Sequence, residues 1–322
     1  TTSQTIISDA LLPLFQLYLG ITESVFGLLG LTLNIVTIIV FIRLGLSDST
    51  NISLTGLAVA NIGVSLTMMG YGALNNPLVL RTVSNVETIE AVRLLLLGIP
   101  NVLFSRIAGL ITAFISLERF LCVAWPLHVK SLVTKRRTIS VIFGVYMFMV
   151  SSHVPIWLAN QIGQRLNPQI NVMVVGVISS QNAEELRNVT ITITVAVQMT
   201  SFAVVAVSTL CMINALRRIT EWRKVVISQE SRKEKQLVKM AILISAVFIV
   251  CSFPSVLANT VMPFFKEFRV QGREKNFFMV SGGFCFTCQL VNATLNTFVY
   301  LAMSSRFRDN VYVVFVCQTR KR

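Results

Sequence analysis

The chain is poor in charge, in histidine and in cysteine outside apolar segments. Only 13% of its 322 residues are charged, whereas a soluble domain carries about 25%. The two histidines are His128 and His153, and there is no Ser/His/Asp set, zinc-ligand spacing or glycine-rich phosphate loop, which argues against an enzyme, a metal site or a cofactor. The six cysteines all lie in or beside apolar segments, so no extracellular disulfide framework is expected.

Long apolar runs are what the chain has in abundance, with 54% hydrophobic residues. Seven stretches reach the length of about 20 residues that crosses a bilayer core. The alternating polarity of membrane-barrel strands is absent, so these spans are predicted to be helices. We predict an all-α fold in which residues 1–322 form one domain, a seven-helix transmembrane bundle. The predicted helices cover about 20–43, 52–75, 91–123, 138–161, 188–217, 235–263 and 276–303, followed by a short interfacial helix over 304–316.

The basic residues are unevenly distributed between the two sides of the membrane. Of the 28 Lys and Arg residues, 19 fall in the loops 43–51, 119–137 and 217–239 and in the tail after 303. By the positive-inside rule these segments are cytoplasmic, which places the N-terminus outside and predicts a multi-pass plasma-membrane protein. The net charge of +14 then reflects topology and lipid headgroups rather than nucleic-acid binding. The sequon at Asn188 falls in a predicted outer loop, where glycosylation is expected.

Short motifs recur in a fixed order along the spans. They are Gly30 to Val36 with Asn34 (GLTLNIV), Leu57–Asn61 (LAVAN), Glu118-Arg119-Phe120, Phe248–Pro254 (FIVCSFP), Asn296–Tyr300 (NTFVY) and Ser304–Asp309. Each motif alone is weak, but their order and their places on successive helices form a consistent set. From about residue 20 to 316 the chain resembles the rhodopsin-like G protein-coupled receptors.

This resemblance implies a ligand-activated receptor that signals to a heterotrimeric G protein. Arg119 is expected to pair with Glu234, which stands 20 residues before Pro254, and this pair is expected to hold the sixth helix closed at rest. The alternative is that both residues are solvated interface charges. The residues implied in G protein coupling or switching are Glu118, Arg119, Phe120, Pro126, Leu127, Glu234, Asn296 and Tyr300. Cys317 is either palmitoylated or unmodified.

Buried amides occupy several of the apolar helices. Asn34, Asn61 and Asn292 form the expected polar core, in which they act either as interhelical glue or as a switch. Asn61 stands where the resembled family has an Asp that binds sodium. Sodium coupling is therefore expected to be weak or lost.

The outer half of the bundle carries the expected ligand pocket. Arg106 stands 13 residues before Arg119, about 20 Å deeper in the membrane. An intramembrane Arg indicates function; its partner is a ligand carboxylate or Glu23, or else it is a structural Arg bonded to carbonyls and polar side chains. The ligand is expected to be an extracellular peptide or small acidic molecule. The pocket candidates are Tyr71, Asn101, Ser105, Arg106, Phe253, Asn259, Phe284 and Gln289.

Several family positions hold other residues here. Leu94 replaces the cysteine that ties the third helix to an outer loop, Ser252 replaces a tryptophan and Thr297 replaces a proline. Tyr146 lies near the position of the missing fourth-helix tryptophan. This mixture resembles divergent invertebrate chemosensory-type or orphan peptide-type receptors. The alternative function is a transporter or ion channel, although the inverted repeats and matched broken helices of transporters are absent from the sequence.

Overall fold

The computed structural model describes residues 6–76, 79, 86–125, 133–167, 172–222, 229–265, 267–268 and 272–316. Within these residues, seven helical spans are long and apolar enough to cross a membrane. They confirm the predicted all-α bundle. The spans are α1 (Leu12–Leu44), α2 (Ser49–Leu74), the continuous series α4 (Val86–Val92), η1 (Arg93–Gly98) and α5 (Ile99–Ala124), then α7 (Lys135–Ala159), α8 (Ala183–Trp222), α9 (Gln229–Val261) and α10 (Lys275–Met303).

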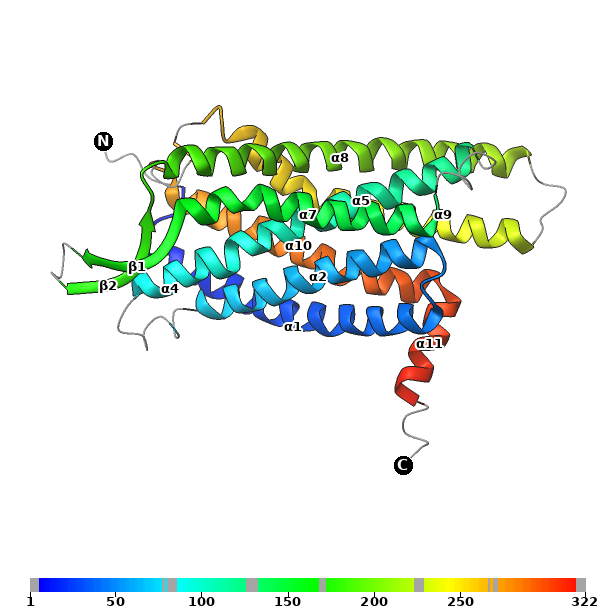
Figure 1. The fold of residues 1–322 in the computed structure, drawn as a ribbon, viewed down its shortest axis with the longest axis horizontal. Helices are drawn as coiled ribbons and strands as arrows, with labels where there is room; N and C mark the ends of the chain where they lie inside the picture. Colours follow the sequence, from blue (N-terminus) through cyan, green and yellow to red (C-terminus); the bar gives the residue numbers. More distant parts are fainter. Residues whose placement is uncertain are drawn as a thin grey trace.

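The spans lie side by side along the long axis of the molecule (Figure 1). One end, here named the outer end, carries the N-terminus and a β-hairpin. The opposite end, the inner end, carries α11 (Ser305–Val316), which turns away from the bundle axis. That direction suits the predicted helix along the membrane surface. At the outer end, the Ile6 amide donates to Glu274 Oε2 at 2.9 Å and thereby fastens the N-terminal segment to the start of α10.

The first helix begins earlier than the sequence predicted. It starts at Leu12 with Pro13 in its first turn, not near residue 20. The predicted span, which began near residue 20, already contained Glu23. In the structure Glu23 lies fully buried inside α1, beside Thr287 of α10. The helix therefore continues past this charge and gains more than two turns at its outer end.

The third span widens before it enters the bundle. Over Arg93–Gly98 the helix takes a π form, and the Ile99 amide bonds to the Leu94 carbonyl, five residues back. Pro100 follows directly; it has no amide hydrogen and its ring crowds the carbonyl four residues earlier. The wider turn accommodates this proline without ending the span. It sets the rotation of α5, and so the direction of every side chain that follows.

Helices α1 and α2 approach until their backbones touch. A Cβ at Gly72 would lie 2.5 Å from the Gly20 carbonyl oxygen, and one at Gly20 would lie 2.8 Å from the Gly72 oxygen. Only glycine fits at both positions. Small residues allow this kind of close packing in membranes, where apolar surface gains little by leaving lipid.

The connection between α7 and α8 contains a hairpin that the sequence did not predict. Strands β1 (Asn160–Asn167) and β2 (Val172–Ser179) pair antiparallel, with Asn160 opposite Ser179. An isolated two-stranded hairpin is marginally stable. Here Thr88 Oγ1 donates to the Val175 carbonyl at 2.7 Å, which attaches β2 to the start of the third span. The hairpin therefore extends the outer end of the bundle on one side (Figure 1).

The apolar cluster with the most members reaches the inner end. Phe307 of α11 is 1% exposed, and its ring packs against Phe41 and Tyr300 with centroids 5.4 and 5.6 Å away. Large apolar side chains cover the outside of the helices instead, for example Val250 at 71% and Leu210 at 62% exposed. Such an apolar exterior is expected of helices whose solvent is lipid.

Candidate functional site

The Glu118–Arg119 pair lies buried at the inner end of α5. Arg119 Nη2 donates to Glu118 Oε1 at 2.5 Å, and Ser49 Oγ, at the start of α2, donates to the same oxygen at 2.8 Å. The side chain of Glu234, the predicted partner, lies outside the described residues. Glu118 Oε2 and Arg119 Nε have no partner in the described part of the chain. The pair therefore links α5 to α2 through Ser49. Its Oε2 and Nε atoms remain available to bond another group at the bundle's inner end.

Phe120 follows the pair and faces the junction of three helices. It packs beside Met212 of α8 and Val238 of α9, and its ring centroid lies 6.4 Å from that of Trp125. A change in the position of α9 would therefore repack Phe120. Pro126 and Leu127, the other residues predicted to contact a G protein here, lie outside the described residues.

A bond between α5 and α9 lies one turn deeper than Arg119. Ser116 Oγ and Ser245 Oγ are 2.7 Å apart, and both side chains are buried, at 0% and 1% exposed. Sequence reasoning missed this pair. The available signal was the presence of two hydroxyl residues within otherwise apolar segments, but nothing in the sequence showed that they meet.

The end of α10 combines a buried amide, a buried phenol and a hydroxyl bridge. Asn296 and Tyr300 are each 1% exposed, and their side-chain polar atoms have no partner in the described residues. Thr297, which stands where the resembled family has a proline, lies 2.9 Å from Thr37 through the two hydroxyl oxygens. Without a proline, α10 runs unbroken from Lys275 to Met303. The threonine therefore fixes α10 to α1.

The polar-core amides divide into two kinds. Asn34 Nδ2 donates to the carbonyls of Gly30, at 2.8 Å, and Ala293, at 3.1 Å, so it acts as glue between α1 and α10. Asn61 makes no side-chain bond within the described residues. It lines an enclosed cavity of about 20 Å³, together with Asn292 and Arg106. A polar cavity of that volume accommodates about one water molecule.

A larger cavity opens above this polar core, toward the outer end. Its volume is about 350 Å³, within the range that holds small ligands. Residues from η1 and from α2, α5, α7, α8, α9 and α10 line it. The lining is mainly apolar and aromatic. Its polar members include Arg106, His153, Asn259 and Gln289.

Arg106 sits at the floor of this cavity without a counter-charge. Within the described residues it forms no ion pair and no hydrogen bond, and its buried Nε is unsatisfied. The described residues show neither the predicted bonds to carbonyls and polar side chains nor the pairing with Glu23. Arg93 provides a contrast, because it bonds Asn75 Oδ1 at 2.8 Å and lies 5.5 Å from the Tyr71 ring centroid. Among the described residues, Arg106 is an unpaired basic side chain on the cavity wall, where an anion inside the bundle could bind it.

Residues 33–300 match the family described as 7 transmembrane receptor (rhodopsin family). This match spans well over half of the chain. The chain belongs to the rhodopsin family of seven-transmembrane receptors. No curated protein matches it in sequence. The family comprises receptors rather than enzymes, and membership does not favour the transporter or channel alternative.

The predicted pocket residues of this receptor line the outer cavity, line the small polar cavity, or lie away from both. Tyr71, Arg106, Asn259 and Gln289 line the outer cavity, and Ser105 lines the small polar cavity. Asn259 and Gln289 are positioned by bonds to Gln198 Oε1, at 2.7 Å, and Ser255 Oγ, at 3.0 Å.

Asn101, Phe253 and Phe284 do not line the outer cavity, contrary to prediction. Asn101 is fully buried against α2, where its Nδ2 donates to Thr67 Oγ1 at 3.2 Å. Phe253 and Phe284 are both 54% exposed and point outward. Successive side chains are rotated by about 100° around a helix axis, so a small error in the assumed rotation moves a side chain from the cavity to the lipid face.

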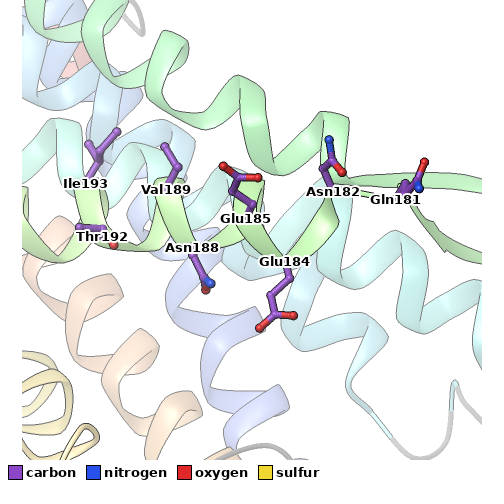
Figure 2. A pocket seen from close by; sticks show the side chains of 8 residues that line it. All are labelled: Gln181, Asn182, Glu184, Glu185, Asn188, Val189, Thr192 and Ile193. Carbon is purple, nitrogen blue, oxygen red and sulfur yellow. The ribbon is translucent and has the colours of Figure 1, made fainter.

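The sequon residue Asn188 lies in a helix, not in the predicted loop. Helix α8 begins at Ala183, so Asn188 falls in its second turn, with its side chain exposed. A hollow of about 700 Å³ runs along this part of the receptor (Figure 2). All its lining residues come from the single stretch 181–193, so it has one wall and no cleft that could enclose a ligand. Glycosylation of Asn188 stays a prediction.

Proposed function

We propose that this receptor binds an anionic ligand at Arg106 and thereby activates a heterotrimeric G protein at its inner end. The observation that supports this most directly is the unpaired guanidinium in the outer cavity. A charge buried inside a membrane bundle is costly unless it is paired. A ligand carboxylate that supplied the partner would form a charge-assisted, bidentate hydrogen bond.

Helices α5 and α9 are the physical connection between the two ends. Arg106 and Arg119 stand on the same helix, about 20 Å apart. Ser255, Ala258 and Asn259 of α9 line the outer cavity, while Ser245 binds the same helix to α5 at Ser116. Near the inner end, Gln236 Nε2 donates to the Met303 carbonyl and so joins α9 to α10. A ligand that binds better when α9 has shifted would weaken these bonds and move the equilibrium toward an open inner end.

Reconstituted receptor provides the test. Purified protein in lipid nanodiscs is expected to accelerate nucleotide exchange on at least one Gα subunit, and Arg119→Ala is expected to abolish this acceleration. Arg136→Ala is the matched control, because Arg136 is exposed at the start of α7 on the same side. Failure on every Gα subunit, with ion or solute passage in liposomes, would instead establish the transporter or channel alternative.

Cellular placement follows from the same proposal. The receptor is expected in the plasma membrane with its outer end extracellular and its basic inner loops beside anionic lipid headgroups. Cys317, the predicted palmitoylation site, lies outside the described residues. The invertebrate chemosensory-type and orphan peptide-type subtypes both stay predictions.

A further inference from the structure

A second apolar hollow lies on the side of the bundle, between α1, α9 and α10. Its volume is about 560 Å³. Four large side chains on its walls are open to the surroundings: Phe15 is 41% exposed, Tyr18 is 72%, Leu257 is 50% and Phe284 is 54%. Each belongs to a membrane-spanning helix, so this hollow, here named the lateral groove, faces lipid.

The lateral groove and the outer cavity adjoin each other and share part of their walls. Ala258, Phe268, Ser281 and Cys285 line both. Cys285 lines the outer cavity together with Arg106. An elongated molecule could therefore place one end at Arg106 and extend its other end past Cys285 to the bilayer.

The charges around the outer cavity limit the head group of such a molecule. Among the described residues that line the cavity, Arg106 is the single Lys or Arg, and none is an Asp or Glu. A single guanidinium matches a carboxylate in charge and in bidentate geometry. A phosphate monoester carries a second charge, for which this wall offers no second Lys or Arg; His153 is the remaining nitrogen base there.

We propose that the ligand is a long-chain carboxylate that reaches the cavity from the bilayer through the lateral groove. Its carboxylate binds Arg106, and its hydrocarbon tail occupies the passage at Ala258 and Ser281 and the groove beyond. This deepens the proposed function, because it names the chemical class that the cavity receives. It also gives the groove residues Phe15, Tyr18 and Leu257 a role in ligand selection.

Binding of tritiated oleate to purified receptor in nanodiscs tests the proposal without a G protein. Oleate is expected to bind saturably, and Arg106→Gln is expected to lower its affinity at least tenfold. Arg106→Lys, which keeps the charge, is expected to retain part of the affinity. Oleyl alcohol, which has the same tail and no charge, is expected to compete at least tenfold less well than oleate.

Blocking the passage tests the route of the tail. Ala258→Trp, and separately Ser281→Trp, place a large ring where the two hollows meet. Gly144→Trp is the matched control, because a Cβ there meets no atom within 4 Å and the residue lies on the outside of α7. Competition by saturated carboxylates of increasing length shows where the tail lies. In the unmodified receptor, affinity referred to the competitor's concentration in the bilayer is expected to rise with chain length until the groove is full. The gain per methylene is expected to stay well below the about 0.8 kcal/mol of transfer from water, because the tail comes from lipid. The blocked variants are expected to lose this gain for the longer chains.

Four results of these two experiments would overturn the proposal. They are equal binding of oleyl alcohol and oleate, an unchanged affinity in Arg106→Gln, the same dependence on chain length in blocked and unblocked receptor, and an equal loss in Gly144→Trp. Stronger binding of lysophosphatidic acid than of oleate would also overturn it, in favour of a phosphate head. If oleate binds as expected but leaves nucleotide exchange on every Gα subunit unchanged, the ligand proposal holds and the G protein proposal fails.

Discussion

At the scale of single residues, the two arginines of the outer half show how function and stability oppose each other. Arg93 has an amide partner and an aromatic face, whereas Arg106 has neither within the described residues. Desolvated charges without partners reduce stability, and replacing them with apolar residues often increases it. A receptor that keeps such a residue gives up stability in the unliganded state and regains it when an anion binds.

Arg106→Met is therefore expected to raise the melting temperature of the unliganded receptor, by about 2–4 °C for about 1 kcal/mol. The same change at the paired residue, Arg93→Met, is expected to lower it, because a hydrogen bond and a cation–π contact are lost. Thermal unfolding of both variants in detergent or nanodiscs measures this. A lower melting temperature for Arg106→Met would show that Arg106 has a structural partner.

A second residue-scale prediction concerns the small polar cavity beneath Arg106. Asn61 brings no charge to it, and Arg106 lines the same walls, so a sodium ion gains no carboxylate and meets a repelling cation. The melting temperature is therefore expected to be the same in sodium as in N-methylglucamine. The double variant Asn61→Asp/Arg106→Met supplies a carboxylate and removes the cation, and it is expected to be stabilised by sodium alone. A sodium-specific shift in the unmodified receptor would contradict this.

At the scale of helices, the bonds that hold α9 decide the resting state. The structure shows the buried Ser116–Ser245 bond, whereas the predicted Arg119–Glu234 pair falls on a side chain outside the described residues. A buried hydrogen bond of this kind contributes about 1 kcal/mol. That is sufficient to change the population of an open state about fivefold.

Ser245→Ala is accordingly expected to raise ligand-independent nucleotide exchange about two- to tenfold. Adding Ser116→Ala should then have little further effect, because the bond is already lost. Thr260→Ala is the control: it also removes a hydroxyl from α9, but Thr260 bonds only to its own helix, at Val256.

Glu234→Ala is expected to raise ligand-independent exchange as well if Glu234 pairs with Arg119 at rest. Basal exchange is measured for this variant beside Ser245→Ala, at matched expression. An increase in Glu234→Ala alone would place the restraint at the ionic pair. An increase in Ser245→Ala alone would place it at the hydroxyl pair and leave Glu234 as a solvated charge.

Helices were more predictable from the sequence than the contacts between them. Apolar length alone identified seven spans, because a helix that crosses lipid must satisfy its own backbone. The start of α1 was placed about eight residues too late, and the hairpin was missed because eight-residue strands leave no such length signal. Asn101 and Phe253 were assigned to the wrong face because their directions depend on helix rotation, which the π segment and tertiary packing set.

At the scale of the whole molecule, the two ends differ in charge and in architecture. The predicted cytoplasmic segments hold 19 of the 28 basic residues, and α11 lies at that end. The hairpin and the N-terminal segment lie at the other end (Figure 1). The basic segments and α11 share one end, and the positive-inside rule predicts that this end is cytoplasmic.

Site-directed cysteine labelling tests this orientation. Gln164→Cys places a thiol on an exposed position of the hairpin, and Asp309→Cys places one on the exposed face of α11. In intact cells a membrane-impermeant maleimide is expected to label the first variant above the background of the native cysteines, because the hairpin lies outside. The second variant is expected to react only after the membrane is permeabilised. The reverse pattern would place the basic loops outside, where no heterotrimeric G protein could reach Arg119, and the proposed coupling would fail with it.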